Sequence, residues 1–284
     1  MSGTLFVVAT PIGNLEDLSF RALRTLKEVD LIAAEDTRRT AKLLAHYEIR
    51  RPMVSLREHN EARETPRLVK RLAAGESIAL VSDAGTPGIA DPGTRFVRAA
   101  REASLRVVPI PGPSAITASL SASGFPADRF AFLGFPPASG AARERWFDEL
   151  AREPRTAVFF EAPHRIRRTL EDCQTILVER QIIVFREITK INEESIDRPN
   201  TTVKELGEFC LVIGPAVAPS VSDATALVEP AELSAMFGYL TEYGLTEGRA
   251  LIMAAKAFDL PPRAAAKILK KHRYSVKSQR DPSP

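Results

Sequence analysis

Cysteine and histidine are scarce in this chain of 284 residues, with two and four copies. Cys173 and Cys210 have no further cysteine or histidine at metal-ligand spacing, which excludes zinc ribbons, disulfide scaffolds and CxxC redox motifs. We therefore expect no bound metal and a reducing compartment, the cytoplasm.

Long apolar runs are also missing. No stretch approaches the roughly 18 to 20 residues of a membrane span, and no basic residue precedes the short apolar run Leu5–Ala9, as a secretory signal would require. Hydrophobic residues nevertheless make up 44% of the chain, which is enough for a sizeable core. These features predict a soluble protein of one large or two medium domains, with no membrane partner.

Charge of one sign is not in excess. Lys and Arg number 39 against 36 Asp and Glu, so no chain-wide polycation indicates nucleic acid. The balance is uneven, because residues 249–284 carry nine basic and two acidic side chains, a local charge of +7, against −4 for the rest. This basic C-terminus is compatible with a solvated helix face and frayed tail or with RNA contact, and charge alone does not decide.

Two phosphate-binding signatures are absent: GxxxxGK[ST], and GxGxxG after the first strand. Their absence argues against nucleotide hydrolysis and ordinary dinucleotide binding. What is present is an alternation of short β-rich runs with helix-length segments, which predicts an α/β fold with a largely parallel sheet. The expected strands of the first half are 5–9, 31–34, 77–81 and 106–110, and helices are expected after Ser19, from Pro92, and from Pro113-Ser114 to Gly124.

A segment rich in Pro and Gly, Phe125–Gly140, predicts a hinge to a second α/β half with more antiparallel pairing. In that half we expect helices at 143–151 and 164–178, and strands at 156–160, 181–187 and 208–213. Helical patterns return at 230–240, 246–258 and 261–271. The predicted division is an α/β domain over 1–124, a second over 125–215, a linker over 216–228 and a basic helical module over 229–284.

Three strand-end loops are dense in small and polar residues, and open α/β sheets bind ligands at such places. They are Thr10–Asn14, Ser82–Gly93 and Pro109–Ala115. Glycines in the second loop permit close backbone approach to a ligand, although the same residues would also serve an elaborate turn. The third loop leads into a helix whose free N–H groups favour a carboxylate.

Taken in order, these loops resemble the tetrapyrrole (corrin/porphyrin) methylase superfamily. The resemblance narrows to its bacterial ribosomal RNA branch, the 16S rRNA (cytidine-2′-O)-methyltransferases, through Leu5–Asp17, Ala34–Arg38, Ser82–Gly88, Pro111–Ala115 and Phe160–Arg165. It covers about residues 4–213, with a weaker match at 244–271. It implies a two-domain fold with S-adenosylmethionine (SAM) in the cleft between two α/β domains, a homodimer, and 16S rRNA within the 30S subunit as partner.

The resemblance and the loop positions together suggest roles for individual residues. The expected cofactor-binding residues are Pro11, Gly13, Asp83, Gly85, Thr86, Pro111, Ser114 and Ala115. A carboxylate or imidazole near the ribose hydroxyl would accept its proton, and the candidates, among which the sequence does not choose, are Asp36, Glu161 and His164. The expected RNA-binding residues are Arg38, Arg57, His59, Arg165, Lys267, Lys270 and Lys271.

Each of these roles has a structural alternative. Asp36 can cap the next helix and pair locally with Arg38, Glu161 can belong to a helix start, and His59 can be an ordinary surface residue.

One stretch departs from the family pattern, because Asn192 stands where the family usually has His and an expected Arg-Gly is replaced within 196–200. The resemblance therefore assigns no role to residues 192–202. Methylation of a porphyrin or corrin, and a non-catalytic module that binds SAM or RNA, remain alternatives.

Overall fold

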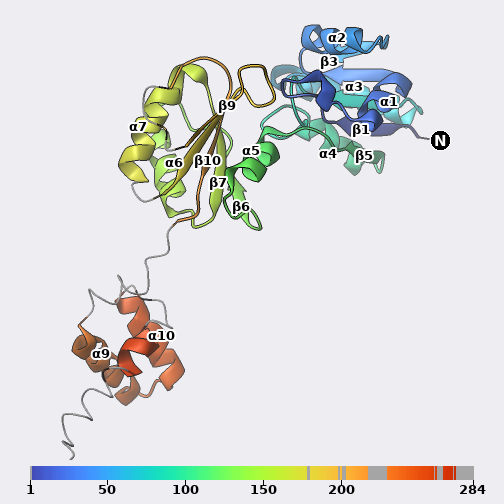
Figure 1. The fold of residues 1–284 in the computed structure, drawn as a ribbon. Helices are drawn as coiled ribbons and strands as arrows, with labels where there is room; N and C mark the ends of the chain where they lie inside the picture. Colours follow the sequence, from blue (N-terminus) through green and yellow to red (C-terminus); the bar gives the residue numbers. More distant parts are fainter. Residues whose placement is uncertain are drawn as a thin grey trace, which may run out of the picture. The chain divides into compact units, whose positions relative to one another are not determined.

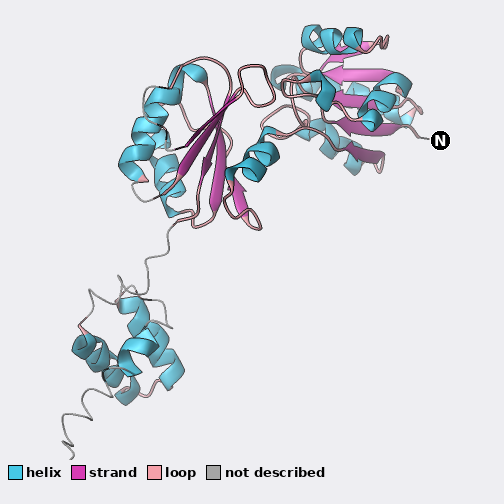
Figure 2. Cartoon of the chain, in the orientation of Figure 1, coloured by secondary structure: helices cyan, strands magenta, loops and turns pink. Residues whose placement is uncertain are grey.

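A computed structural model describes residues 2–177, 180–197, 199, 203–216, 229–258, 260, 265–270 and 272. The chain folds into two compact units, 1–216 and 217–284. The first unit holds two five-stranded sheets, and the second is helical in its described residues (Figures 1 and 2). The α/β fold with an additional helical part is therefore confirmed, while the residue boundaries of the four-part division stay a prediction.

The first sheet is entirely parallel, with the strand order β3-β2-β4-β1-β5. Its strands are β1 (Thr4–Val8), β2 (Leu31–Ala34), β3 (Met53–Ser55), β4 (Ile78–Val81) and β5 (Arg106–Ile110). The four strands expected from the sequence are confirmed to within one residue at each end. β3 has only three residues, too few for an alternation pattern to define its bounds.

Helices cover both faces of this sheet because both faces of its strands are apolar. In β2, Ile32 and Ala34 join the cluster under one pair of helices, and Leu31 and Ala33 join the cluster under the other pair. A strand buried on both faces reads as a continuous apolar run, as this one does. The first pair is α1 (Phe20–Glu28) with α2 (Thr37–His46), and the second is α3 (Glu58–Ala73) with α4 (Thr94–Glu102).

Local signals mark where these helices begin. The Ser19 hydroxyl accepts a hydrogen bond from the backbone N–H of Ala22 at 3.1 Å, so the expected cap of α1 is confirmed. α4 begins at Thr94, two residues later than expected, because Gly93 with φ +125° is its N-cap. The expected third helix is confirmed as α5 (Ala115–Ser123), which ends at Gly124 in the left-handed conformation.

The second sheet is mixed, with the order β6-β7-β10-β8-β9 and three antiparallel pairings. Its strands are β6 (Phe130–Phe132), β7 (Thr156–Glu161), β8 (Ile182–Arg186), β9 (Glu194–Asp197) and β10 (Phe209–Ile213). The sequence did not predict β6, which lies in the expected hinge, or β9. Both are short edge strands, whose pairing depends on a neighbouring strand rather than on their own apolar pattern.

Helices again cover both faces of this sheet. α6 (Gly140–Arg152) and α7 (Ile166–Ile176) pack on one face around Phe147, Phe159 and Leu170. α5 packs on the other face, where Ile116 and Leu120 meet residues of β7 and β10. α5 starts directly after the loop of β5 and covers the second sheet, so it connects the two sheets.

The second unit contains α9 (Pro230–Glu242), α10 (Glu247–Ala257) and helical residues at 265–270. Leu233, Ala254, Ala255 and Ile268 form its core. The predicted linker lies, from residue 217 on, outside the described residues. No helix in the described part of the chain is both long and apolar enough to cross a membrane.

Candidate ligand cavity and its polar network

A cavity of about 350 Å³ lies where the strand-end loops of the first sheet meet residues of the second sheet. Small-molecule sites occupy roughly 300–1,000 Å³, so the cavity suits a small organic ligand. Five of the residues predicted from the sequence line it: Gly85, Thr86, Ser114, Ala115 and Glu161.

Backbone hydrogen bonds hold two of the loops together. Thr10 and Gly85 exchange two of them, N–H to O at 2.9 and 3.0 Å, and the Thr10 hydroxyl donates to the Ser82 carbonyl at 3.2 Å. Gly85 has φ +74°, which costs glycine little and other residues more. The loop after β4 therefore presents its backbone to the cavity in a conformation that glycine permits.

Four predicted cofactor residues lie next to the lining rather than in it: Pro11, Gly13, Asp83 and Pro111. Gly13 has a clear packing reason, because a Cβ there would lie 2.3 Å from Cγ of Lys190. The lack of a side chain at Gly13 thus allows the loop Thr10–Asn14 to pack closely against the turn after β8. Pro11 and Gly13 flank Ile12, which does line the cavity.

The N-terminus of α5 reaches the cavity. Ser114, Ala115 and Ile116 line it, and the Ser114 side chain makes no capping hydrogen bond. The first N–H groups of a helix have no partner within the helix and carry a partial positive charge. This end of α5 is therefore suited to an anionic group.

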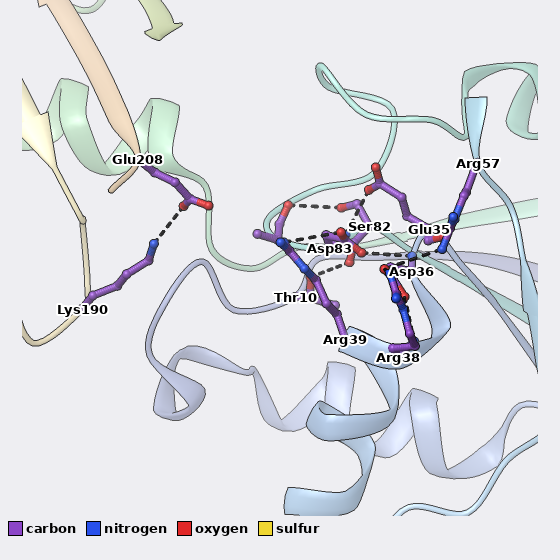
Figure 3. A network of polar contacts seen from close by, with 11 residues as sticks. Thr10, Glu35, Asp36, Arg38, Arg39, Arg57, Ser82, Asp83, Lys190 and Glu208 are labelled. Atoms are coloured by element: carbon purple, nitrogen blue, oxygen red, sulfur yellow. Dashed lines mark hydrogen bonds and ion pairs between the residues drawn. The ribbon is translucent and has the colours of Figure 1, made fainter. Parts of the chain in front are cut away.

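A polar network joins the carboxyl ends of β2 and β4 (Figure 3). The Asp36 N–H donates to Oδ1 of Asp83 at 3.0 Å, and the Asp83 N–H donates to Oε2 of Glu35 at 3.1 Å. Nη1 of Arg39 lies 3.4 Å from Oδ2 of Asp83. Asp83 therefore holds the two strand ends together, and burial raises the pKa of Glu35.

The carboxylate of Asp36 is occupied by arginine. Nε and Nη2 of Arg38 lie 3.0 and 2.6 Å from its two oxygens, and Nη2 of Arg57 lies at 3.5 Å. The same carboxylate caps α2 by accepting from the Arg38 N–H at 2.9 Å. The hydrogen bond from the Arg38 side chain holds the pKa of Asp36 far below its usual range, so this group is a weak proton acceptor.

Glu161 is buried, and each of its carboxylate oxygens is engaged. Oε1 accepts from the Ala162 N–H at 2.7 Å and pairs with Nη2 of Arg165 at 2.7 Å. Oε2 accepts from the Thr169 hydroxyl at 2.5 Å and lies 3.9 Å from Nη1 of Arg143. This pattern is that of a structural anchor between β7 and α7, in which both carboxylate oxygens already have partners.

Asp91 lines the cavity and has a different environment. Burial, together with the nearby negative charges of Glu35 and Asp83, raises its pKa to about 6, against a smaller opposing effect from a hydrogen bond with Ser82. No Lys or Arg among the described residues forms an ion pair with it. Asp91 belongs to the loop Ser82–Gly93 that the sequence singled out, but its burial and the charges around it could not be inferred from the sequence.

The remaining predicted residues are not among those that line the cavity. His164 and His59 are exposed, while Arg165 points inward to Glu161 and donates from Nη1 to the Pro136 carbonyl at 3.0 Å. In the second unit Lys267 and Lys270 are exposed, and Lys271 lies outside the described residues. Their roles in RNA binding stay predictions.

The sequence analysis missed the cavity residues that the second sheet supplies. They are Phe135, Ile188, Glu208, Phe209 and Cys210. They follow β6 and β8 or lie at the start of β10, so only the pairing of strands in the second sheet brings them to one place. Burial raises the pKa of the Cys210 thiol to about 12, so it is a packing residue and not a nucleophile.

The stretch that departs from the family pattern forms the turn after β8 and the strand β9. Ile191 and Asn192 are exposed there, and Lys190 Nζ pairs with Glu187 at 2.7 Å and with Glu208 at 3.0 Å (Figure 3). Residues 198 and 200–202 lie outside the described residues. Across the residues that the structure describes, no cluster of three metal-ligating side chains occurs.

Comparison with known proteins places this geometry in a family. The model of the tetrapyrrole (corrin/porphyrin) methylases matches residues 4–206. A solved structure of the methyltransferase CobJ aligns with a TM-score of 0.57 at 18% identity, covering 76% of this chain and 95% of that one. Uroporphyrin-III C-methyl transferase from Thermus thermophilus, solved with S-adenyl homocysteine, aligns with a TM-score of 0.50 at 18% identity, covering 75% of this chain and 97% of that one. These two likenesses concern the fold alone.

A curated relative narrows the assignment. "Ribosomal RNA small subunit methyltransferase I" of Xylella fastidiosa is 45% identical over 276 residues, 94% of this chain and 93% of that protein. The chain therefore belongs to the tetrapyrrole methylase family and, within it, to the branch whose curated members are named ribosomal RNA small subunit methyltransferase I.

Proposed function

We propose that this protein transfers the methyl group of SAM to the ribose 2′-oxygen of a cytidine in 16S rRNA of the small ribosomal subunit. One observation carries the proposal: the similarity to a ribosomal RNA methyltransferase spans 94% of the chain, whereas the methylase family model ends at residue 206. The shared region therefore includes most of the helical unit. A small acidic tetrapyrrole would not require such a unit.

The cavity suits SAM. The N-terminus of α5, with Ser114 and Ala115, would hold the carboxylate, and Gly85 and Thr86 would contact the rest of the molecule through backbone atoms. When bound, SAM supplies a methyl carbon activated by a sulfonium. The chain itself supplies position, and orienting two reactants is worth several kcal/mol in such a displacement.

RNA would be held by basic side chains of both units. Arg38 is 82% exposed and Arg57 is 41% exposed, so both offer N–H groups to phosphates while they orient Asp36. Lys267 and Lys270 are exposed on the second unit. Arg165 is the least available of the predicted contacts, because it pairs with the buried Glu161.

Transfer of a tritiated methyl group tests the proposal directly. Purified protein with tritiated SAM is given 30S subunits, free 16S rRNA or uroporphyrinogen as acceptor. We expect label in rRNA that survives base removal and stays on a cytidine ribose. Label in uroporphyrinogen alone would establish porphyrin methylation instead, and SAM binding without transfer to any acceptor would identify a non-catalytic module.

A further inference from the structure

One carboxylate in the cavity wall has no place in the roles considered so far. Asp91 lies near the end of the loop from Ser82 to Gly93, in which Gly88, Ala90 and Gly93 all have positive φ. Ala90, at φ +61°, adopts a conformation that residues with a Cβ rarely take. Such backbone strain persists only where the surroundings enforce it, and here it places the neighbouring carboxylate at the cavity.

The three proton acceptors expected from the sequence are poorly placed to accept a proton in the cavity. Asp36 is held by Arg38 and is not among the cavity-lining residues. Glu161 lines the cavity, but both of its oxygens are already bonded. His164 is exposed and lies outside the lining.

The third carboxylate of the lining is also engaged. Glu208 pairs with Lys190 at 3.0 Å on the side of the second sheet. Among the described residues, Asp91 is thus the lining carboxylate that has no ion-pair partner. A carboxylate neutralised by a cation loses basicity, and one that lacks a cation keeps it.

The charged groups that face Asp91 act in the same direction. Glu35, after β2, and Asp83, after β4, are negative and raise its pKa, against the opposing effect of a hydrogen bond with the Ser82 hydroxyl. Arg39 and Arg57 belong to the same network, but they contact Asp83 and the Glu35–Asp36 turn instead of Asp91. In this environment Asp91 is ionised at neutral pH and is basic enough to accept a proton.

We propose that Asp91 is the proton acceptor for the attacking ribose 2′-hydroxyl, an inference that rests on the proposed function. In this step the 2′-oxygen forms a bond to the methyl carbon as the sulfur–methyl bond breaks. The bonding pair stays on sulfur, and the hydroxyl proton moves to the Asp91 carboxylate, which then releases it to water. The step needs neither an oxidant nor a further reactant.

Asp91→Asn tests this assignment, because the amide keeps the size of the side chain and cannot take up the proton. General bases contribute about 10² to 10⁴ in rate. We expect kcat for rRNA methylation to fall at least 100-fold, while the calorimetric Kd for SAM stays within twofold. Asp91→Glu should restore part of kcat, and Asp148→Asn, the same change on the exposed face of α6, should change nothing.

The pH dependence gives a second readout. Below about pH 6 the Asp91 carboxyl is protonated, so the wild-type rate should fall tenfold per pH unit there, and the residual rate of Asp91→Asn should not. Titration of the Asp91 carboxyl carbon by NMR in the protein without ligand should give a midpoint near 6. This measurement does not depend on turnover.

Several outcomes would overturn the inference. A Kd for SAM raised tenfold or more with kcat unchanged would make Asp91 a ligand of the SAM amine, and an unchanged kcat and Kd would leave it no role. A midpoint near 4 in the NMR titration, with a rate independent of pH between 5 and 7, would contradict it even if Asp91→Asn does not fold. Wild-type protein that methylates no RNA would overturn the proposed function itself, and this inference with it.

Discussion

At the scale of single residues, charge pairing decides which polar side chains are free to act. Glu161 and Asp36 both occur in motifs that suggest chemistry, yet each is bound by arginine. Glu161 is buried, whereas Arg38, the partner of Asp36, is mostly exposed. The ion pairs of Glu161 and of Asp36 therefore differ in what they contribute to stability.

Glu161→Gln should destabilise the protein strongly. The substitution leaves the buried Arg143 and the partly buried Arg165 facing an amide, and breaking a buried ion pair costs about 3–5 kcal/mol. Urea unfolding followed by circular dichroism measures this loss. The exposed pair of Glu102 with Arg98 on α4 is the control, since Glu102→Gln should cost less than about 1 kcal/mol. Equal effects of the two substitutions would contradict a structural role for Glu161.

Gly85→Val should abolish SAM binding while the protein stays folded. Gly85 has φ +74° and lines the cavity, so a branched side chain there both strains the loop and fills the space. Calorimetric titration with SAM measures the affinity. Gly124→Val is the matched control, because Gly124 has φ +69°, open space around it and no place in the cavity lining. If Gly85→Val binds SAM as the wild type does, the SAM site lies elsewhere.

At the scale of elements, helix ends and strand ends build the cavity. α5 begins at it with an uncapped N-terminus, whereas α1 begins elsewhere with a capped one. Capping and the helix dipole favour a negative charge at either start, so the two helices form a matched pair for experiment.

Ser114→Asp should weaken SAM binding at least tenfold without loss of stability. The new carboxylate would occupy the N-terminus of α5, where it stabilises the helix by up to about 1 kcal/mol and repels the ligand carboxylate. Calorimetry gives the SAM affinity, and urea unfolding gives the stability. Ser19→Asp at the start of α1 should leave the affinity unchanged. A normal affinity in Ser114→Asp would show that no anion binds at this helix end.

At the scale of the whole molecule, the predicted catalysis and part of the predicted RNA binding fall in different units. The cavity belongs to the unit 1–216, and exposed Lys267 and Lys270 belong to the unit 217–284. Basic helices that contact phosphates give an affinity that falls with salt, independently of the chemistry in the cavity.

Deletion of residues 220–284 should weaken binding to 30S subunits and flatten its salt dependence, while the affinity for SAM stays the same. Each lost phosphate contact reduces the slope of log K against log salt by about 0.7 to 0.9. Titrations at several salt concentrations measure the slope. The same slope in the truncated protein would make the basic helices a solubilising surface and place the RNA contacts on Arg38 and Arg57.

We expect the full-length protein to form a homodimer, as its family resemblance implies. Light scattering at micromolar concentration should give twice the chain mass of 31.1 kDa. A monomer at that mass would contradict the expectation.

The sequence by itself determined four of the five strands of the first sheet, the starts of α1 and α5, and the three loops that meet near the cavity. Apolar periodicity, capping residues and glycine-rich turns act over a few residues, so they can be read along the chain. Tertiary structure decided the rest. Asp83 bonds to Asp36 across 47 positions, and Arg143 on α6 lies 3.9 Å from Glu161 at the end of β7, so neither pairing could be read from the sequence. Because a side chain's basicity depends on the charges packed around it, only the fold distinguished the free Asp91 from the bound Asp36.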